Sequence, residues 1–250
     1  MPLAGALDSA SARLANRLVG NEDGDALLEA TLGGTTFDVG DALTFAVTGA
    51  PCDVLVNGNA AAWGEAVTVP AGARIVVGPA TTGVRAYVAV SGGIQVEPVL
   101  GSRSTDTLAF VGPPVVTAGT VLPVGPARDI PGEAAAIPRS YDHVELRYHV
   151  GPRADWFSTR LEGTYEVTPD SNRVGLRLKG APLRRSRDDE LPSEGIVLGA
   201  IQVPANGQPL VFLNDHPTTG GYPVVGVVRR EDLHLCAQLR PGNRVTLRPR

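Results

Sequence analysis

The many glycines and prolines of this chain, together with its short apolar runs, predict a mainly β fold with few short helices. The 250 residues include 30 glycines and 21 prolines, which separate short segments rich in β-branched residues. Strands at such regular spacing, with Gly and Pro between them, indicate antiparallel barrels or sandwiches. Apolar residues make up 43% of the chain and charged residues 19%, a composition that is typical of a globular protein.

Two helical segments are predicted. Asp8 is suited to cap a helix over Ser9–Val19, and Gly20 ends that helix. Asp232 is suited to cap a shorter helical turn through Leu239, which a Pro-Gly pair follows. The rest of the chain is expected to be strand, turn or loop.

The Asn57-Gly58 pair, directly after a strand over Val54–Val56, is the strongest hairpin signal, because these residue types adopt positive φ readily. The other predicted strands are Leu43–Val47, Val67–Val69, Arg74–Val77, Arg85–Val90, His143–Val150, Thr164–Thr168, Val174–Leu178, Leu210–Leu213, Val224–Val228 and Arg244–Leu247. The stretch Pro126–Ser140 is rich in Pro, Gly and Ala and has no periodicity, so it predicts a linker. The expected domains are therefore two β-rich halves, 1–133 and 138–250.

Composition excludes several classes of function. A formal net charge of −4 argues against a nucleic-acid partner, since phosphate binding requires a basic face. No run approaches the 18 or so apolar residues of a membrane span, so no membrane partner is expected. The N-terminus lacks the basic and apolar regions of a secretion signal, and the expected location is the cytoplasm.

The cysteine, histidine and lysine inventory argues against a bound metal or a covalent cofactor. Cys52 and Cys236 match no metal or redox spacing, and the four histidines form no zinc motif, so no metal is expected. Lys179 is the only lysine, and it lies in no Gly-Lys-Ser/Thr triplet of a phosphate-binding loop. Covalent attachment of biotin also requires a lysine, and Lys179 is the only one. Any nucleotide or biotin must therefore be handled by other chemistry or by a partner chain.

The segment Asp215–Pro223 is the most polar break between two strand-like runs, and it contains Asp215, His216, two threonines, two glycines and a tyrosine. Adjacent glycines allow close approach of the backbone to a ligand, and successive turn amides form anion-binding nests. The alternative is a tight turn whose polar residues satisfy their own backbone.

Two further segments place an arginine among small polar residues beside a glycine, at Gly101–Asp106 and Ser171–Gly175. Arginine presents a planar fork suited to carboxylate or phosphate. Each loop alone is more simply explained by an arginine that pairs with a neighbouring carboxylate. Three such segments together suggest one shared polar site, which would be expected at the junction between the halves.

In order along nearly the whole chain, these motifs resemble the family that comprises the C subunit of 5-oxoprolinase, allophanate hydrolase subunit 2 and KipA-like proteins. The segments that carry the resemblance are Ala86–Ile94, Pro98–Asp106, Ala154–Phe157, Ser171–Gly175, Ser193–Gly195, Gly199–Pro204, Thr218–Pro223 and Ala237–Gly242. Family members usually carry a strand and a Gln-Asp-x-Gly-Arg segment before the stretch that resembles residues 2–8, with which this chain starts.

The resemblance implies two cyclophilin-like antiparallel β-barrel halves and one component of an ATP-dependent 5-oxoprolinase, which converts 5-oxo-L-proline to L-glutamate together with the A and B subunits. The expected partners are a homologue of the B subunit (KipI-like, allophanate hydrolase subunit 1), in some systems the A subunit, and a small-molecule substrate. One alternative is the carboxyltransferase half of a urea carboxylase or allophanate hydrolase system, which accepts carboxybiotin from another chain. Another is a non-catalytic antagonist that binds a histidine-kinase inhibitor. The complex is expected to use ATP, and the isolated chain is expected to be inactive.

The residues of the three segments have distinct expected roles. The proton-handling candidates are Asp215, His216 and Glu194, of which histidine is favoured near neutral pH. The alternative is that Asp215 caps its turn and His216 is solvated. The candidates for binding substrate or stabilising an oxyanion are Arg103, Ser104, Asp106, Asn172, Arg173, Thr218, Thr219, Gly220, Gly221 and Tyr222. The mixed-charge run 184–190 is expected to be a solvated loop, with ordering over a ligand as the alternative.

Overall fold

The computed structural model describes residues 4–131, 135–187 and 189–250, which form two compact units that interleave along the sequence. Unit 1 comprises Met1–Leu7, Ser104–Gly112 and Tyr141–Arg250, and unit 2 comprises Asp8–Arg103 and Pro113–Ser140. The predicted halves are each contiguous, whereas these units are not. Parts of three predictions lie outside the described residues: residues 2–3 of the stretch 2–8, residues 132–134 of the linker, and Asp188 of the mixed-charge run 184–190.

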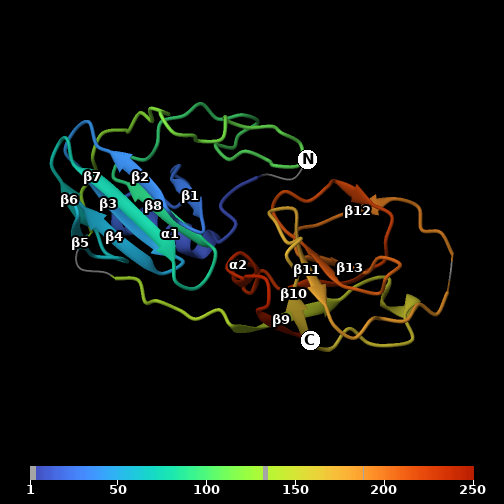
Figure 1. Cartoon of the computed structure of the whole chain (residues 1–250). Coiled ribbons are helices and arrows are strands. Elements are labelled where there is room, and N and C mark those ends of the chain that lie inside the picture. Colours follow the sequence, from blue (N-terminus) through green and yellow to red (C-terminus); the bar gives the residue numbers. More distant parts are fainter. Residues whose placement is uncertain (1–3, 132–134, 188) are drawn as a thin grey trace. The chain divides into compact units, whose positions relative to one another are not determined.

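Unit 2 contains two four-stranded antiparallel sheets (Figure 1). One sheet has the order β1 (Leu28–Thr31), β8 (Arg85–Val90), β3 (Leu43–Gly49), β6 (Val67–Val69). The other has the order β2 (Thr35–Asp38), β7 (Arg74–Ala80), β4 (Cys52–Val56), β5 (Asn59–Ala61). Phe45 and Val88 from the first sheet share one apolar core with Val54 and Val77 from the second, so burial of both inner faces holds the unit together.

Helix α1 (Ser9–Leu18) begins where the sequence predicts. The Asp8 carboxylate accepts a hydrogen bond from the Ser11 amide at 2.9 Å, which satisfies one of the free amides of the first turn. The helix buries Ala12, Ala15 and Leu18 within unit 2. Gly20 follows it with φ of 75°, and a Cβ there would lie 2.1 Å from a backbone oxygen, so glycine is required.

Unit 1 is built on a closed seven-stranded barrel (Figure 1, yellow to red). Around the barrel the order is β10 (Gly163–Val167), β11 (Gly175–Lys179), β14 (Leu210–Phe212), β13 (Ala200–Gln202), β16 (Val224–Val228), β9 (His143–Val150), β17 (Arg244–Pro249). Leu146, Leu176, Val211 and Leu247 fill its core. Neighbouring strands are antiparallel except β17 and β9, which are parallel. The predicted mainly β fold with a barrel and few short helices is confirmed. The parallel pairing of β17 with β9, which closes the barrel, was not predicted.

The remaining elements of unit 1 are short. A 3-10 turn, η1 (Ala154–Trp156), and a two-stranded ladder of β12 (Glu194–Gly195) and β15 (Thr219–Gly220) lie outside the barrel order. Helix α2 (Leu233–Cys236) falls in the predicted segment and Asp232 stands at its N-cap position, as predicted, but the Asp232 side chain makes no capping hydrogen bond. The Asp232 carboxylate instead accepts hydrogen bonds from Arg147, 2.8 Å from Nε and 2.9 Å from the backbone amide, because this pairing compensates a buried charge.

Candidate functional site

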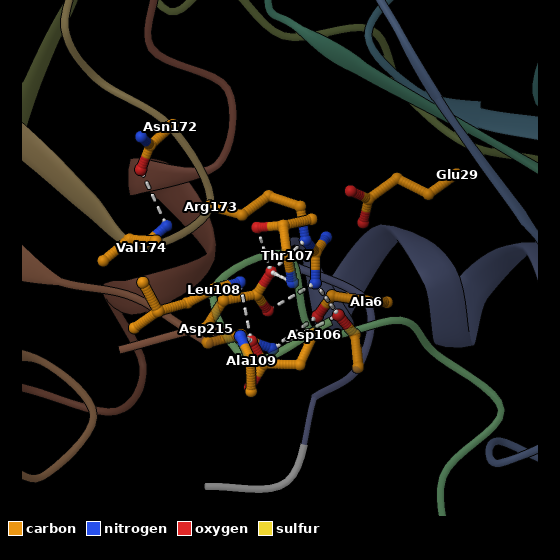
Figure 2. A network of polar contacts seen from close by, with 12 residues as sticks. Ala6, Glu29, Asp106, Thr107, Leu108, Ala109, Asn172, Arg173, Val174 and Asp215 are labelled. Atoms are coloured by element: carbon orange, nitrogen blue, oxygen red, sulfur yellow. Dashed lines mark hydrogen bonds and ion pairs between the residues drawn. The ribbon is translucent and has the colours of Figure 1, made fainter. Parts of the chain in front are cut away.

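The polar centre of unit 1 is an ion pair between Arg173 and Asp215 (Figure 2). The guanidinium binds the carboxylate in a bidentate geometry, with Nε 2.9 Å from Oδ2 and Nη2 3.1 Å from Oδ1. The Asp215 side chain is fully buried, and that of Arg173 is 16% exposed. A planar guanidinium fork matches a carboxylate in geometry as well as in charge. Two segments that the sequence singled out therefore meet at one buried contact.

A third segment, Ser104–Gly112, is anchored on the same carboxylate. Thr107 donates to Asp215 Oδ2 from its backbone amide at 2.9 Å and from its hydroxyl at 2.7 Å. Asp106, the neighbouring residue, is itself buried and accepts hydrogen bonds from the amides of Leu108 and Ala109, both at 2.8 Å. Asp106 thus shapes the turn of this segment, and Asp215 fastens the turn to the barrel (Figure 2).

The stretch before α1 also reaches this centre. The carbonyl oxygen of Gly5 accepts a hydrogen bond from Arg173 Nη2 at 2.8 Å, and Asn214 Nδ2 lies 3.3 Å from the carbonyl oxygen of Ala6. Four donors, two from Arg173 and two from Thr107, occupy the Asp215 carboxylate. This geometry makes the Asp215 carboxylate the anchor that joins the segments of Arg173 and Thr107.

His216, the next residue, presents one ring nitrogen to a backbone carbonyl oxygen. Its side chain is buried, and Nδ1 lies 2.8 Å from the carbonyl oxygen of Pro217. A carbonyl oxygen only accepts, so in the neutral ring Nδ1 carries the hydrogen and Nε2 carries the lone pair. The ring centroid lies 6.2 Å from that of Phe212, in a tilted arrangement that fixes the ring plane. The alternative interpretation of a solvated histidine does not match this burial.

The Thr-Thr-Gly-Gly loop is held by a short ladder. Gly220 lies opposite Glu194 and Thr219 opposite Gly195 in the register of β12 and β15. The Glu194 carboxylate is paired with Arg153, whose hydrogen bond holds the pKa of Glu194 below its usual value. Glu194 is therefore ionised near neutral pH and lies on the strand next to the loop.

Gln202 positions the same loop, and sequence reasoning assigned it no role. Its side chain is buried on β13 and donates from Nε2 to the carbonyl oxygen of Tyr222 at 2.9 Å. A Cβ on Gly220 would lie 2.9 Å from that nitrogen, so the loop passes close over the amide. The sequence does offer one signal for this role, a glutamine between apolar residues in a strand. Such a side-chain amide is rarely buried without a hydrogen-bond partner. Tyr222 itself is 49% exposed.

The remaining predicted binding residues have local contacts. Asn172 Oδ1 accepts from the Val174 amide at 2.8 Å and so shapes the turn that carries Arg173. Ser104 is the first residue of the segment Ser104–Gly112 in unit 1. Arg103 belongs to unit 2, where its Nε donates to the carbonyl oxygen of Val96 at 2.8 Å. The backbone oxygen of Thr218 accepts a hydrogen bond from the Ile196 amide at 2.9 Å.

Unit 2 contains a buried polar cluster that sequence reasoning missed. The hydroxyl of Tyr87 accepts the Asp8 amide at 2.7 Å and donates to Glu29 at 3.0 Å, and Arg85 lies 3.2 Å from the same carboxylate. Burial raises the pKa of Tyr87 well above its usual value, and the Glu29 charge adds to this effect. The available signal was an arginine and a tyrosine within an otherwise apolar strand.

No cluster of metal-binding side chains occurs among residues 4–131, 135–187 and 189–250. Within those residues no helix is long and apolar enough to cross a membrane. Cys52 and Cys236 are both buried free thiols.

The fold and site thus define a mainly β protein in which a buried Arg–Asp centre lies beside a Gly-rich loop. The family model described as carboxyltransferase domain, subdomain A and B, matches residues 1–249, and the chain belongs to this family. The sequence is 37% identical to the C subunit of 5-oxoprolinase from Escherichia coli (strain K12) over 246 residues, 95% of this chain and 79% of the relative. The predicted family membership is confirmed.

Two solved structures extend the comparison. The K. lactis urea amidolyase is similar with a TM-score of 0.92 and 29% identity, over 99% of this chain and 17% of that chain. The protein TTHA0988 is similar with a TM-score of 0.86 and 36% identity, over 98% of this chain. The chain spans half the length of the TTHA0988 chain.

Proposed function

We propose that this chain is the C subunit of an ATP-dependent 5-oxoprolinase, which acts with the A and B subunits to open 5-oxo-L-proline to L-glutamate. The observation that carries this proposal is the 37% identity to a protein named as that subunit, which extends over 95% of this chain. ATP is handled by the partner subunits, since the sequence has no phosphate-binding loop with a lysine. The proposed location is the cytoplasm.

Ring opening is the hydrolysis of an amide, in which water adds to the carbonyl carbon, the C–N bond breaks and the nitrogen takes up a proton. His216 Nε2 is the proposed acceptor of the proton that water loses, because the bond from Nδ1 to Pro217 leaves Nε2 as the basic nitrogen. Thr218, Thr219 and the amides of Gly220 and Gly221 are the proposed donors to the oxyanion.

The arginines and carboxylates have supporting roles in this proposal. Arg173 is a proposed ligand of a substrate carboxylate or carboxyphosphate oxygen, and Arg103, in unit 2, is a separate candidate for such a contact. Asp215 orients Arg173, Asp106 and Asn172 shape the turns of their own segments, and Ser104 is a further candidate for a substrate contact. Glu194, which faces Gly220 across the ladder, is a second candidate for proton transfer, and Tyr222 is a candidate substrate contact.

A second candidate function is the carboxyltransferase half of a urea carboxylase, with carboxybiotin delivered by another chain. The specific observation in its favour is the TM-score of 0.92 to the K. lactis urea amidolyase over 99% of this chain. The third candidate, an antagonist that binds a homologue of the B subunit, requires no chemistry from the Thr-Thr-Gly-Gly loop.

Reconstitution of the chain with its A and B partners distinguishes these functions. We expect L-glutamate to form from 5-oxo-L-proline only with ATP and all three subunits, and Thr219→Ala to slow turnover about tenfold without loss of the complex. Thr36→Ala, which alters an exposed threonine on a short strand of unit 2, is the matched control. Urea-dependent turnover with carboxybiotin instead would support the second function. An intact complex without either activity would support the antagonist.

A further inference from the structure

A cavity with both polar and apolar lining residues lies on the outer face of the barrel of unit 1, over β11. It has a volume of about 330 Å³ and is bounded by the turn that follows β10 and by the turn that precedes β14. A second, more open cavity of about 540 Å³ adjoins it, and Asp170 and Arg177 line both. The smaller volume is at the lower end of the range for small-molecule sites.

Two cations lie on the floor of this site. Arg177 and Lys179 are two residues apart on β11 and are both exposed, while Leu176 and Leu178 face the barrel core. Alternate residues of a strand point to one face with their Cα atoms about 6.6 Å apart, so two long cationic side chains can reach one small ligand. Neither side chain makes a hydrogen bond or ion pair with any described residue, although Glu166 lies opposite Lys179 in register.

One carboxylate and several neutral polar groups also line the cavity, beside the apolar side chains of Pro204, Pro209 and Leu210. The Asp170 side chain lines both cavities and, within the described part of the chain, has no hydrogen-bond or ion-pair partner. The Thr168 hydroxyl is buried and likewise has no partner among described residues. Gln208, on the opposite wall, is held in place because its side chain bonds to both backbone groups of Gly180 at 2.8 and 3.2 Å.

We propose that this cavity binds a small amino dicarboxylate. Two cations match two carboxylates, and Asp170 matches an ammonium group that a simple anion lacks. Inorganic phosphate would satisfy the cations but would meet repulsion from Asp170. A nucleotide base is disfavoured because the lining contains no aromatic ring on which it could stack.

The site is linked through one hairpin to the Arg173 centre. The turn between β10 and β11 carries Asp170 and Asn172 on the cavity wall and Arg173 in the ion pair with Asp215. A ligand that orders this turn will therefore also restrict Arg173. L-Glutamate is a small amino dicarboxylate and therefore belongs to the proposed ligand class. That L-glutamate is also the product of the complex rests on the proposed function.

The single lysine allows a direct binding test on the isolated chain. Reductive methylation with ¹³C-formaldehyde keeps the charge and labels only Lys179 and the N-terminal amine. We expect L-glutamate to shift the Lys179 methyl resonance with saturation, and Arg177→Gln to weaken that binding about tenfold. Asp170→Asn should weaken binding of L-glutamate about fivefold, whereas glutarate, which has no ammonium and is repelled by the Asp170 carboxylate, should bind the variant at least as well as the wild type.

The control is Arg248→Gln, since Arg248 is an exposed arginine of the same barrel that is already paired with Glu145 at 2.9 Å. It should leave the shift intact. The proposal is overturned if L-glutamate gives no saturable shift at tens of millimolar, if inorganic phosphate binds as well as L-glutamate, or if Asp170→Asn weakens both organic ligands equally. None of these outcomes depends on turnover or on the partners in the complex.

Discussion

Thr107 and Asp215, which are 108 residues apart in sequence, are joined by two hydrogen bonds to one buried carboxylate oxygen. The contact belongs to unit 1, although Thr107 lies in a segment that is flanked on both sides by residues of unit 2. Since Arg173 binds the same carboxylate, one buried charge organises three separate parts of the chain. Loss of that charge should therefore affect far more than a local turn.

Asp215→Asn should lower the free energy of unfolding of unit 1 by about 3 kcal/mol, because it leaves Arg173 largely buried without its counter-charge. Urea denaturation followed by the fluorescence of Trp156, in a Trp63→Phe background, measures this unit. Glu145→Gln removes an exposed partner of Arg248 in the same unit and should change stability by less than about 0.5 kcal/mol. Equal effects of the two substitutions would contradict the anchoring role of Asp215.

Thr107→Val should loosen the segment Ser104–Gly112, because the hydroxyl donor to Asp215 is lost at a cost of about 1–3 kcal/mol. Phe110 in this segment is 86% exposed, so cleavage by chymotrypsin reports its mobility. We expect faster cleavage after Phe110 in the variant. Thr164→Val, which removes an exposed hydroxyl bonded only to Thr246, should leave the cleavage rate as in the wild type.

Gln202→Leu should raise amide hydrogen exchange over residues 218–222, because the loop loses the donor that holds the Tyr222 carbonyl oxygen. Hydrogen exchange followed by mass spectrometry measures this directly. Gln95→Leu is a suitable control, since that side chain bonds to a turn of unit 2 at Gly92. Unchanged exchange over 218–222 in Gln202→Leu would show that Gln202 does not hold the loop.

Acid should weaken the contact between Arg147 and Asp232. Burial alone would raise the pKa of Asp232, but hydrogen bonds from Arg147 outweigh it and hold that pKa below its usual value of 3.8. The stabilisation is thus fully present above pH 3.8 and is lost as the pH falls through the lower folded-state pKa. The difference in stability between wild type and Asp232→Asn should shrink as the pH falls below 3.8, and a constant difference would refute this.

The two thiols should be inert in the folded protein. Burial raises the pKa of Cys52 to about 11 and that of Cys236 to about 12, with Asp53 and Asp232 adding to the respective effects. Thiolate is the reactive form, so a disulfide reagent at pH 8 should label neither cysteine in buffer and both in urea. Rapid labelling of native Cys236 would show that its site opens readily.

Local signals in the sequence predicted the local structure. Asp8 caps α1, and Asn57 and Gly58 take φ values of 51° and 82° in the turn between β4 and β5, because both features depend on adjacent residues. The parallel pairing of β9 and β17 has no such signal, since about a hundred residues separate these strands and no local pattern sets their direction.

The candidate site could be predicted in part for the same reason. Arg173 and Asp215 stand out as charged residues in glycine-containing loops, and the structure brings them together. Thr107 could not be singled out, because an exposed threonine in a loop is ordinary until its distant partner is known. Gln202 and Tyr87 lie in strands, where a side chain is expected to pack, and their roles depend on what faces them across the fold.

We propose that the loop 215–223 of this chain supplies catalytic groups to a 5-oxoprolinase. The most direct test is the rate of ATP-dependent L-glutamate formation from 5-oxo-L-proline by the complex with the A and B subunits, for wild type and His216→Gln. We predict a fall in kcat of about 100-fold or more with the complex intact, because a positioned general base contributes at least that much. Wild-type turnover in the His216→Gln complex would contradict it.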